Sequence, residues 1–344
     1  MAQFGKPADI RVGCIGYGGA FNMGKAHLAE MVRAGMTPTA VAEVDSSRLA
    51  VAAKEFPGIE TYGSVAAMLR RSKVNLLAII TPHNTHARLA LQCLRAGRHV
   101  VCEKPLAIRT EECDAMIREA RRRRLVISTY HNRHWDGHIL EAVRRIRGGA
   151  LGELVRVECR MGGYGKPGDW WRSSRSISGG ILYDWGVHLL EYALQVIGGE
   201  MTEVSGYSHT GFWAKQTKWR RDGNEDEGTA VVRFRSGCLL HLRISNIDSN
   251  PKPGIVEFVG TKGSYVMDFA GFDLYTHPVE GETQAVKGRN PPGEGWRFYQ
   301  NIADHLTNGK PLVITGEWAR RPIHILDLAS RSARLGRALP ARYG

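Results

Sequence analysis

The chain has 344 residues, of which 43% are hydrophobic and 24% charged, and its net charge is +13. This composition excludes a disordered chain, and no apolar run approaches the ~20 residues that a membrane-spanning helix needs, so we expect a soluble protein with no membrane partner. No nucleic-acid recognition motif accompanies the positive charge, which favours an anionic cofactor or substrate over nucleic acid as the partner. The first nine residues contain no apolar signal core, so we expect a cytoplasmic protein.

The first 130 residues alternate between two hydrophobic periods. Short, β-branched and almost wholly apolar runs predict strands that are buried on both faces, and helical patterns lie between them. Strands are predicted at 10–15, 39–44, 74–80, 99–102 and 125–130, and helices at 23–34, 45–56, 85–96 and 110–124. This order predicts an α/β domain over residues 1–130 with a doubly wound parallel sheet.

Beyond residue 130 the pattern changes to alternating segments with glycine-rich turns, which predict a large, open, mainly antiparallel sheet. Such segments occur at 228–235, 238–247, 254–260 and 263–268, and helices are predicted at 138–147, 184–197 and 316–335. We therefore predict a second, α+β domain over residues 131–344, whose last helix, at about 316–336, could pack back on the first domain.

The first strand runs into a glycine-rich turn that begins at Gly16 and ends at Gly24. A strand that turns sharply into a helix exposes backbone N–H groups and can hold a pyrophosphate. The strict G-x-G-x-x-G pattern fails here, because Phe21 stands where the third glycine belongs and the next one follows three residues later. The turn by itself could therefore equally be an ordinary glycine-rich loop.

Asp45 ends the second predicted strand, 21 residues beyond Gly24. A carboxylate there accepts hydrogen bonds from the adenosine ribose and repels a 2′-phosphate, so it favours NAD over NADP. Two alternatives stay open at this point. Asp45 could serve only as a helix N-cap, and the nearby Arg48 could serve a 2′-phosphate.

Two further segments carry charged or titratable side chains. Glu103-Lys104-Pro105 follows the fourth predicted strand, where the ends of parallel strands line a ligand crevice, although a surface ion pair is the simpler interpretation. Asp184 and His188 are four residues apart, so we expect them on one face of a helix, either as an ordinary helical pair or as an oriented general base. The six cysteines show no metal-ligand spacing, and we predict no metal site.

Taken together, these segments resemble the Gfo/Idh/MocA family of nicotinamide-dependent oxidoreductases over nearly the whole length. Residues 179–188 match the family pattern G-G-x-L-x-D-x-G-x-H at every fixed position. The other carriers of the resemblance are the turn at 16–24, Thr81-Pro82 with His86, Glu103-Lys104-Pro105 and Trp171-Arg172. The resemblance implies a Rossmann domain followed by a substrate and oligomerisation domain, which forms a homodimer or homotetramer.

The resemblance also implies roles for individual residues. Lys104, Asp184 and His188 would form the catalytic set, with His188 taking the hydroxyl proton and Lys104 polarising the substrate oxygen. The resemblance assigns Glu103 to the nicotinamide ribose of the coenzyme. The implied cofactor contacts are Gly16, Gly18, Gly19, Ala20, Phe21, Asn22, Asp45, Thr81, Pro82, Asn84, His86, Glu103, Lys104 and Arg172. The implied substrate contacts are Lys104, Asn132, Tyr164, Trp171, Arg172, Asp184 and His188.

Three functions follow from these expectations. The first is an NAD-dependent dehydrogenase for a sugar or polyol. The substrate could be anionic, because the Arg172 guanidinium can bind a carboxylate or sulfonate. The second uses the same scaffold for redox-neutral glycoside cleavage, in which a hydroxyl is transiently oxidised, the glycosidic substituent is eliminated, water adds and the sugar is reduced again. The third is a non-catalytic nucleotide sensor, which fits poorly because the whole catalytic set is present.

Overall fold

The computed structural model describes residues 2–278 and 281–341, and these divide into two compact units. The first unit contains the described residues up to Asn132 together with Trp296–Arg320. The second contains residues 133–295 and the described residues from 321 onward. Among the described residues, no helix combines the length and the apolar character needed to cross a bilayer.

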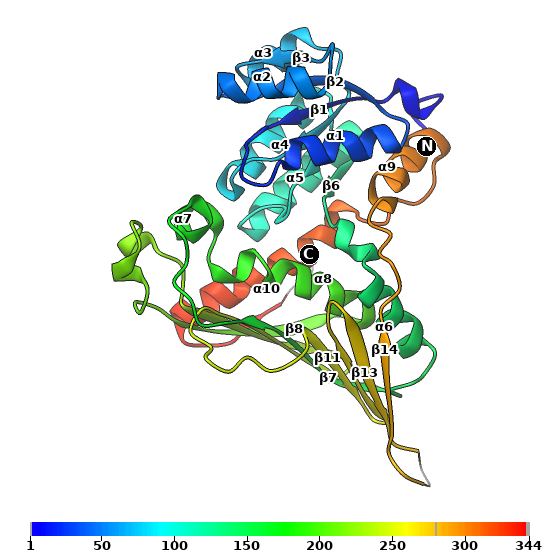
Figure 1. Ribbon diagram of the computed structural model, residues 1–344, viewed down its shortest axis with the longest axis vertical. Coiled ribbons are helices and arrows are strands. Elements are labelled where there is room, and N and C mark those ends of the chain that lie inside the picture. The colour runs from blue at the N-terminus through cyan, green and yellow to red at the C-terminus, as the bar shows by residue number, and fades with distance from the viewer. Residues whose placement is uncertain (1, 279–280, 342–344) are drawn as a thin grey trace. The chain divides into compact units, whose positions relative to one another are not determined.

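The first unit is a parallel sheet, as predicted, and its strand order is β3-β2-β1-β4-β5-β6 (Figure 1). It has six strands rather than the five predicted, because the short strand Glu60–Tyr62 was missed. The direction of strand order reverses between β1 and β4, the place where open α/β sheets bind ligands at the carboxyl ends of their strands. The elements are β1 Arg11–Ile15, α1 Met23–Arg33, β2 Thr37–Ala42, α2 Ser46–Glu55, β3 Glu60–Tyr62, α3 Val65–Arg71, β4 Leu76–Ile79, α4 His86–Arg95, β5 His99–Cys102, α5 Thr110–Arg123, β6 Ile127–Thr129 and α9 Arg297–Asn308.

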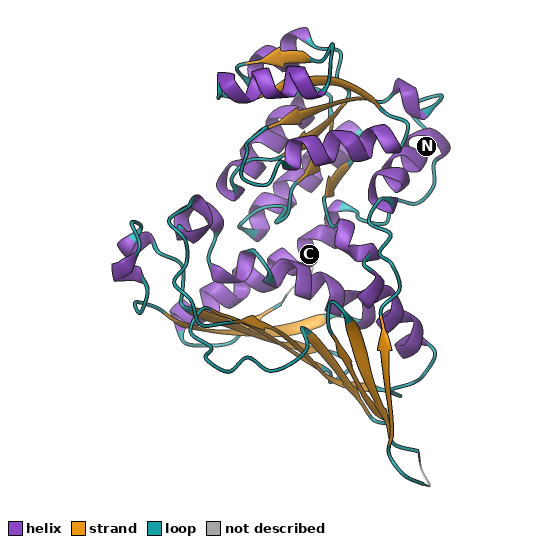
Figure 2. Ribbon diagram, in the orientation of Figure 1, coloured by secondary structure: helices purple, strands orange, loops and turns teal. Residues whose placement is uncertain are grey.

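The second unit is built on a nine-stranded sheet in the order β14-β13-β12-β11-β7-β10-β9-β8-β15. Among the described strands of this sheet, β7 and β10 pair in parallel and all other neighbours pair antiparallel. Helices lie on one face of this sheet (Figure 2), with α8 packed against β7 and β10. The elements are α6 Gly137–Arg147, β7 Leu154–Gly162, α7 Arg175–Ser178, α8 Gly186–Val196, β8 Met201–His209, β9 Glu227–Phe234, β10 Leu239–Ser245, β11 Val256–Gly260, β12 Gly263–Met267, β13 Gly271–Thr276, β14 Gln284–Arg289, α10 Gly316–Leu335 and β15 Leu339–Pro340.

The period-two segments of the second unit become strands because every second side chain is buried. In β9 and β10 the side chains of Ala230, Val232, Leu240 and Leu242 are fully buried, while the residues between them are partly exposed. The sequence interpretation missed β7, β8, β13 and β14. The signal was present in β7, where the buried Val157 and Cys159 alternate with charged residues. It also missed α9, an amphipathic helix. The chain forms α9 after most of the second unit, but the helix belongs to the first unit.

One predicted helix begins later than expected. The pattern at 184–197 corresponds to α8, which starts only at Gly186, and a 3-10 turn at Ile181–Tyr183 precedes it. Asp184 has ψ −73° and ends that 3-10 turn. The expectation that Asp184 and His188 share one face of a helix is therefore wrong, because the two residues belong to different elements.

Candidate functional site

In the first unit, the glycine turn after β1 is shaped for close approach to its backbone. Gly16 has φ +93°, and a Cβ there would lie 2.2 Å from the carbonyl oxygen of Ile80, so no other residue fits. A Cβ at Gly18 would meet nothing within 4 Å. The turn is therefore closed towards the protein at Gly16 and open at Gly18, as a backbone that cradles phosphates requires.

Gly24 replaces the missing third glycine of the pattern. It lies in the first turn of α1, and a Cβ there would stand 2.5 Å from the ring of Tyr17. Gly24 also lies against β1, because its carbonyl oxygen is 3.8 Å from Cys14 Sγ, so the close helix-to-strand packing for which the pattern needs its third glycine is present. The extra residues belong to the turn itself: Phe21 is exposed, and Asn22 is the N-cap of α1 with φ 50°.

Glu43, which the sequence interpretation passed over, is the acidic side chain that holds the glycine turn. Its Oε2 accepts a hydrogen bond of 2.6 Å from the N–H of Tyr17, and its Oε1 accepts from the N–H groups of Val44 and Asp45. The strand predicted at 39–44 extends too far, because β2 ends at Ala42 and Val44 is exposed. The signal that could have found Glu43 is its place as the first polar residue after the buried strand.

Asp45 is exposed and caps α2, where its Oδ1 accepts hydrogen bonds from the Ser47 hydroxyl and the Ser47 N–H. Those bonds lower the pKa of Asp45. Arg48 lies against the glycine turn. Its Nε donates to the carbonyl oxygen of Tyr17 at 2.8 Å, and a Cβ added at Gly19 would lie 3.2 Å from its guanidinium. Two carboxylates and one guanidinium therefore border the turn.

The segment after β4 carries Thr81, Pro82, Asn84 and His86. His86 is fully buried, and its two ring nitrogens lie 2.8 Å from the carbonyl oxygens of Thr81 and Pro105. Burial lowers the pKa of His86. Its ring joins the ends of β4 and β5, so any contribution of His86 to coenzyme binding would be indirect.

Glu103 and Lys104 follow β5 at the same edge of the sheet. Glu103 Oε2 accepts a hydrogen bond of 2.9 Å from the Lys104 N–H, and Glu103 Oε1 lies 3.1 Å from His27 Nε2. Burial alone would raise the pKa of Glu103, but the hydrogen bond from His27 and the neighbouring charge of Lys104 bring it below its ordinary value. Glu103 is thus held as a carboxylate at the carboxyl edge of the sheet.

In the second unit, Arg172 and Asp184 form an ion pair of 2.8 Å between Nη1 and Oδ1. The Arg172 guanidinium also lies over the rings of Trp170 and Trp171, 5.1 and 5.3 Å from their centroids. His188 follows in the first turn of α8, with 7% of its surface exposed and its ring centroid 5.5 Å from that of Trp185. This arrangement combines a carboxylate, a guanidinium and an imidazole with aromatic rings.

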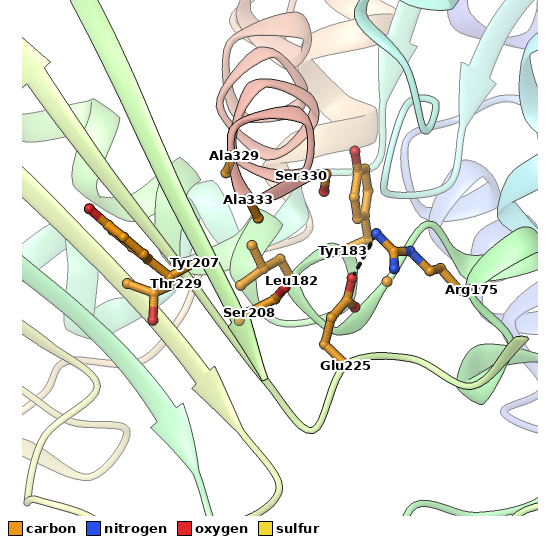
Figure 3. Close-up of a pocket in the computed structure, with 12 residues that line it drawn as sticks. Arg175, Leu182, Tyr183, Tyr207, Ser208, Glu225, Thr229, Ala329, Ser330 and Ala333 are labelled. Atoms are coloured by element: carbon orange, nitrogen blue, oxygen red, sulfur yellow. Dashed lines mark ion pairs between the residues drawn. The ribbon is translucent and has the colours of Figure 1, made fainter. Parts of the chain in front are cut away.

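The side chains of Asn224 and Glu225 hold the turns that carry Arg172 and Asp184, and the sequence interpretation missed both of them. Glu225 Oε2 accepts from the Ile181 N–H at 2.9 Å, and Glu225 Oε1 pairs with Arg175 at 3.2 Å (Figure 3). Asn224 Nδ2 donates to the carbonyl oxygen of Arg172 at 2.7 Å. No local sequence pattern could have found these contacts, because they join residues more than 40 positions apart.

Two further predicted substrate contacts occupy separate places. Tyr164 is 60% exposed and forms an aromatic cluster with Phe212 and Trp213, at centroid distances of 6.2 and 5.6 Å. Asn132 begins the short 3-10 turn Asn132–Trp135 at the end of the first unit. The structure thus assembles one group of predicted residues on each unit, and the joint action of Lys104 with Asp184 and His188 stays a prediction.

Comparison with known proteins places both units in one family. Residues 10–131 match the oxidoreductase family with an NAD-binding Rossmann fold, and residues 139–266 match the GFO/IDH/MocA C-terminal domain. The chain is 23% identical to the scyllo-inositol 2-dehydrogenase (NADP(+)) IolW of Bacillus subtilis, over 97% of this chain and 96% of that protein. It is 28% identical to the myo-inositol 2-dehydrogenase of Thermotoga maritima, over 67% of each. The structure of levoglucosan dehydrogenase with NADH and levoglucosan has the same fold, with a TM-score of 0.84, 20% identity and coverage of 97% and 100%.

Proposed function

This chain belongs to the Gfo/Idh/MocA family of NAD(P)-dependent oxidoreductases, and we propose that it oxidises a secondary alcohol of a sugar or cyclic polyol with NAD. The observation that carries the proposal is the segment 179–188, in which Asp184 pairs with Arg172 and His188 follows at the start of α8. Two relatives named as inositol dehydrogenases support the substrate class.

The glycine turn and the acidic residues beside it fit a dinucleotide. Gly18 leaves room for a phosphate, and Glu43 fixes the turn through the Tyr17 N–H. NAD, when bound, supplies the hydride acceptor. We favour NAD over NADP because two acidic residues, Glu43 and Asp45, follow β2, where a carboxylate repels a 2′-phosphate, whereas Arg48 donates a hydrogen bond to the Tyr17 carbonyl oxygen.

In the proposed reaction, His188 accepts the proton of the substrate hydroxyl. The hydride leaves the carbon that bears this hydroxyl and passes to NAD. The Lys104 ammonium stabilises the negative charge that develops on that oxygen, an effect that a fixed cation supplies without reorganisation. Asp184 and Arg172 neutralise each other, so the pair orients the substrate without adding net charge. An anionic substrate would have to displace Asp184 from Arg172, and we therefore propose a neutral, hydroxyl-rich substrate.

The test is oxidation of a panel of sugars and inositols by the purified protein, followed as NADH absorbance. We expect NADH to form with at least one cyclic polyol or sugar. His188→Asn and Lys104→Met should each lower kcat by about 10²- to 10⁴-fold while NADH binding is kept, which is the range expected for general acid–base groups. Wild-type protein that binds no dinucleotide, or variants as active as the wild type, would overturn the proposal.

The aromatic cluster of Tyr164, Phe212 and Trp213, in which Tyr164 and Phe212 are exposed, favours a second candidate, redox-neutral glycoside cleavage, because aromatic faces can hold an aryl or sugar substituent. A nitrophenyl glycoside distinguishes the two candidates. Release of nitrophenol without net NADH supports cleavage, whereas NADH formation with an intact glycosidic bond supports the dehydrogenase.

A further inference from the structure

We propose that His27 and Tyr299 form a buried relay that positions the Glu103 carboxylate for the ribose on the nicotinamide side of the coenzyme. The inference rests on the proposed function and adds two residues to it, from α1 and α9. Tyr299 Oη lies 2.5 Å from His27 Nδ1, and His27 Nε2 lies 3.1 Å from Glu103 Oε1. The three side chains thus form a continuous chain of hydrogen bonds that ends at the carboxyl edge of the sheet.

The relay is built from helices that are distant in the sequence but adjacent in the first unit. α1 follows the glycine turn and contacts α9 (Figure 1). His27 and Tyr299 are fully buried, and the ring of Tyr130 packs on His27 with a centroid distance of 4.1 Å. Burial of polar groups is costly unless they are hydrogen-bonded, so both His27 nitrogens need the partners that the structure gives them.

The direction of the hydrogen bonds follows from their chemistry. Burial raises the pKa of Tyr299 well above its ordinary value, so its phenol keeps its proton and donates to His27 Nδ1. His27 Nε2 then carries the ring proton and donates to Glu103 Oε1. Tyr299 therefore selects the histidine tautomer that Glu103 requires.

The relay leaves Glu103 with a fixed orientation and spare acceptor capacity. Oε1 accepts from His27 and Oε2 accepts from the Lys104 N–H, which prevents rotation of the carboxylate. Each carboxylate oxygen can accept a second hydrogen bond. A carboxylate fixed in this way can accept bonds from the two hydroxyls of a ribose without first losing side-chain entropy on binding.

The relay is tested by binding of NADH and of ADP to the full chain, measured by calorimetry. ADP lacks the nicotinamide ribose, so it reports the adenosine side alone. Tyr299→Phe should weaken NADH binding about five- to tenfold, and His27→Ala about tenfold or more, with ADP affinity changed less than about twofold. His27→Gln keeps a donor towards Glu103 and should recover most of the loss.

Tyr130→Phe is the matched control, because it removes a buried phenol that donates to Glu30 in the same cluster, and it should leave NADH affinity unchanged. Equal losses of NADH and ADP affinity in the variants, or none, would overturn the relay while leaving the proposed function intact. A wild-type chain that binds neither NADH nor NADPH would overturn both.

Discussion

The two units hold their candidate functional residues in different ways. In the first unit the glycine turn, Thr81 and Glu103 directly follow β1, β4 and β5, so a regular parallel sheet positions them. In the second unit Arg172 and Asp184 lie in short 3-10 turns, and side chains from residues 224–225 hold those turns. Strand ends are set by backbone hydrogen bonds, whereas the turns depend on individual side chains.

The difference teaches where each unit is vulnerable. A parallel sheet with buried strands tolerates few changes where the backbone passes closely, and its functional groups move only if the sheet moves. A turn fixed by two or three side chains can lose its geometry while the sheet below it stays folded. We therefore expect substitutions to affect global stability in the first unit and local geometry in the second.

Gly16→Ala is expected to have the largest effect. The methyl group would lie 2.2 Å from the Ile80 carbonyl oxygen at a φ of +93°, so the free energy of unfolding should fall by about 3–5 kcal/mol. Gly18→Ala, in open space, should change it by less than about 0.5 kcal/mol. Urea unfolding of the two variants measures the difference, and equal stabilities would show that the turn is not set by close packing.

Acid is expected to weaken the first unit through His99, at the start of β5. Burial, with a smaller effect of His305, lowers the pKa of His99 from 6.5 to about 4, and its Nδ1 accepts from the Val126 N–H. Between pH 6.5 and about pH 4, His99 is protonated in the unfolded chain but stays neutral in the folded chain. Stability is therefore complete above that pH and should fall by about 3 kcal/mol as the pH drops to about 4.

The measurement is denaturant unfolding at a series of pH values between 7.5 and 4. His99→Asn keeps an acceptor for Val126 but cannot titrate, so it should remove most of this pH dependence. An equally steep loss of stability in that variant would assign the acid sensitivity to other groups.

Glu225→Ala tests how far the geometry of the Asp184 turn in the second unit affects kcat and stability. It removes the acceptor of the Ile181 N–H and the partner of Arg175, so we expect about 2 kcal/mol of lost stability and roughly a tenfold lower kcat. Glu200→Ala breaks an exposed pair with Arg235 and should cost less than about 0.5 kcal/mol with no change in kcat. Normal kcat in the Glu225 variant would mean that the Asp184 turn holds itself.

Glu43→Gln has the smallest expected effect, a weakening of NADH binding by about fivefold, because a charged acceptor beside the turn becomes neutral. The ratio of NADPH to NADH affinity should rise at the same time. Asp45→Asn preserves an N-cap for α2 and should change NADH affinity less than about twofold. A larger effect at Asp45 than at Glu43 would instead support Asp45 as the ribose-binding acid that the sequence predicts.

Much of the first unit was predictable, because buried parallel strands and the helices between them leave strong periodic patterns. The pattern also predicted Glu103-Lys104 at a strand end. The contact of Glu43 with the glycine turn was missed because Val44, an exposed valine, made β2 look two residues longer than it is. Gly24 shows the reverse case: the spacing departs from the pattern, but the packing that the pattern serves is present.

The sequence by itself determined the two sheet types, the glycine turn and the matched segment 179–188, since hydrophobic period and turn chemistry act over short distances along the chain. Only the tertiary structure decided that Asp184 pairs with Arg172 outside α8, that Glu225 holds its turn and that Tyr299 reaches His27. These contacts join side chains from 12 to 272 positions apart, and such partners are chosen by packing in three dimensions rather than by any local pattern.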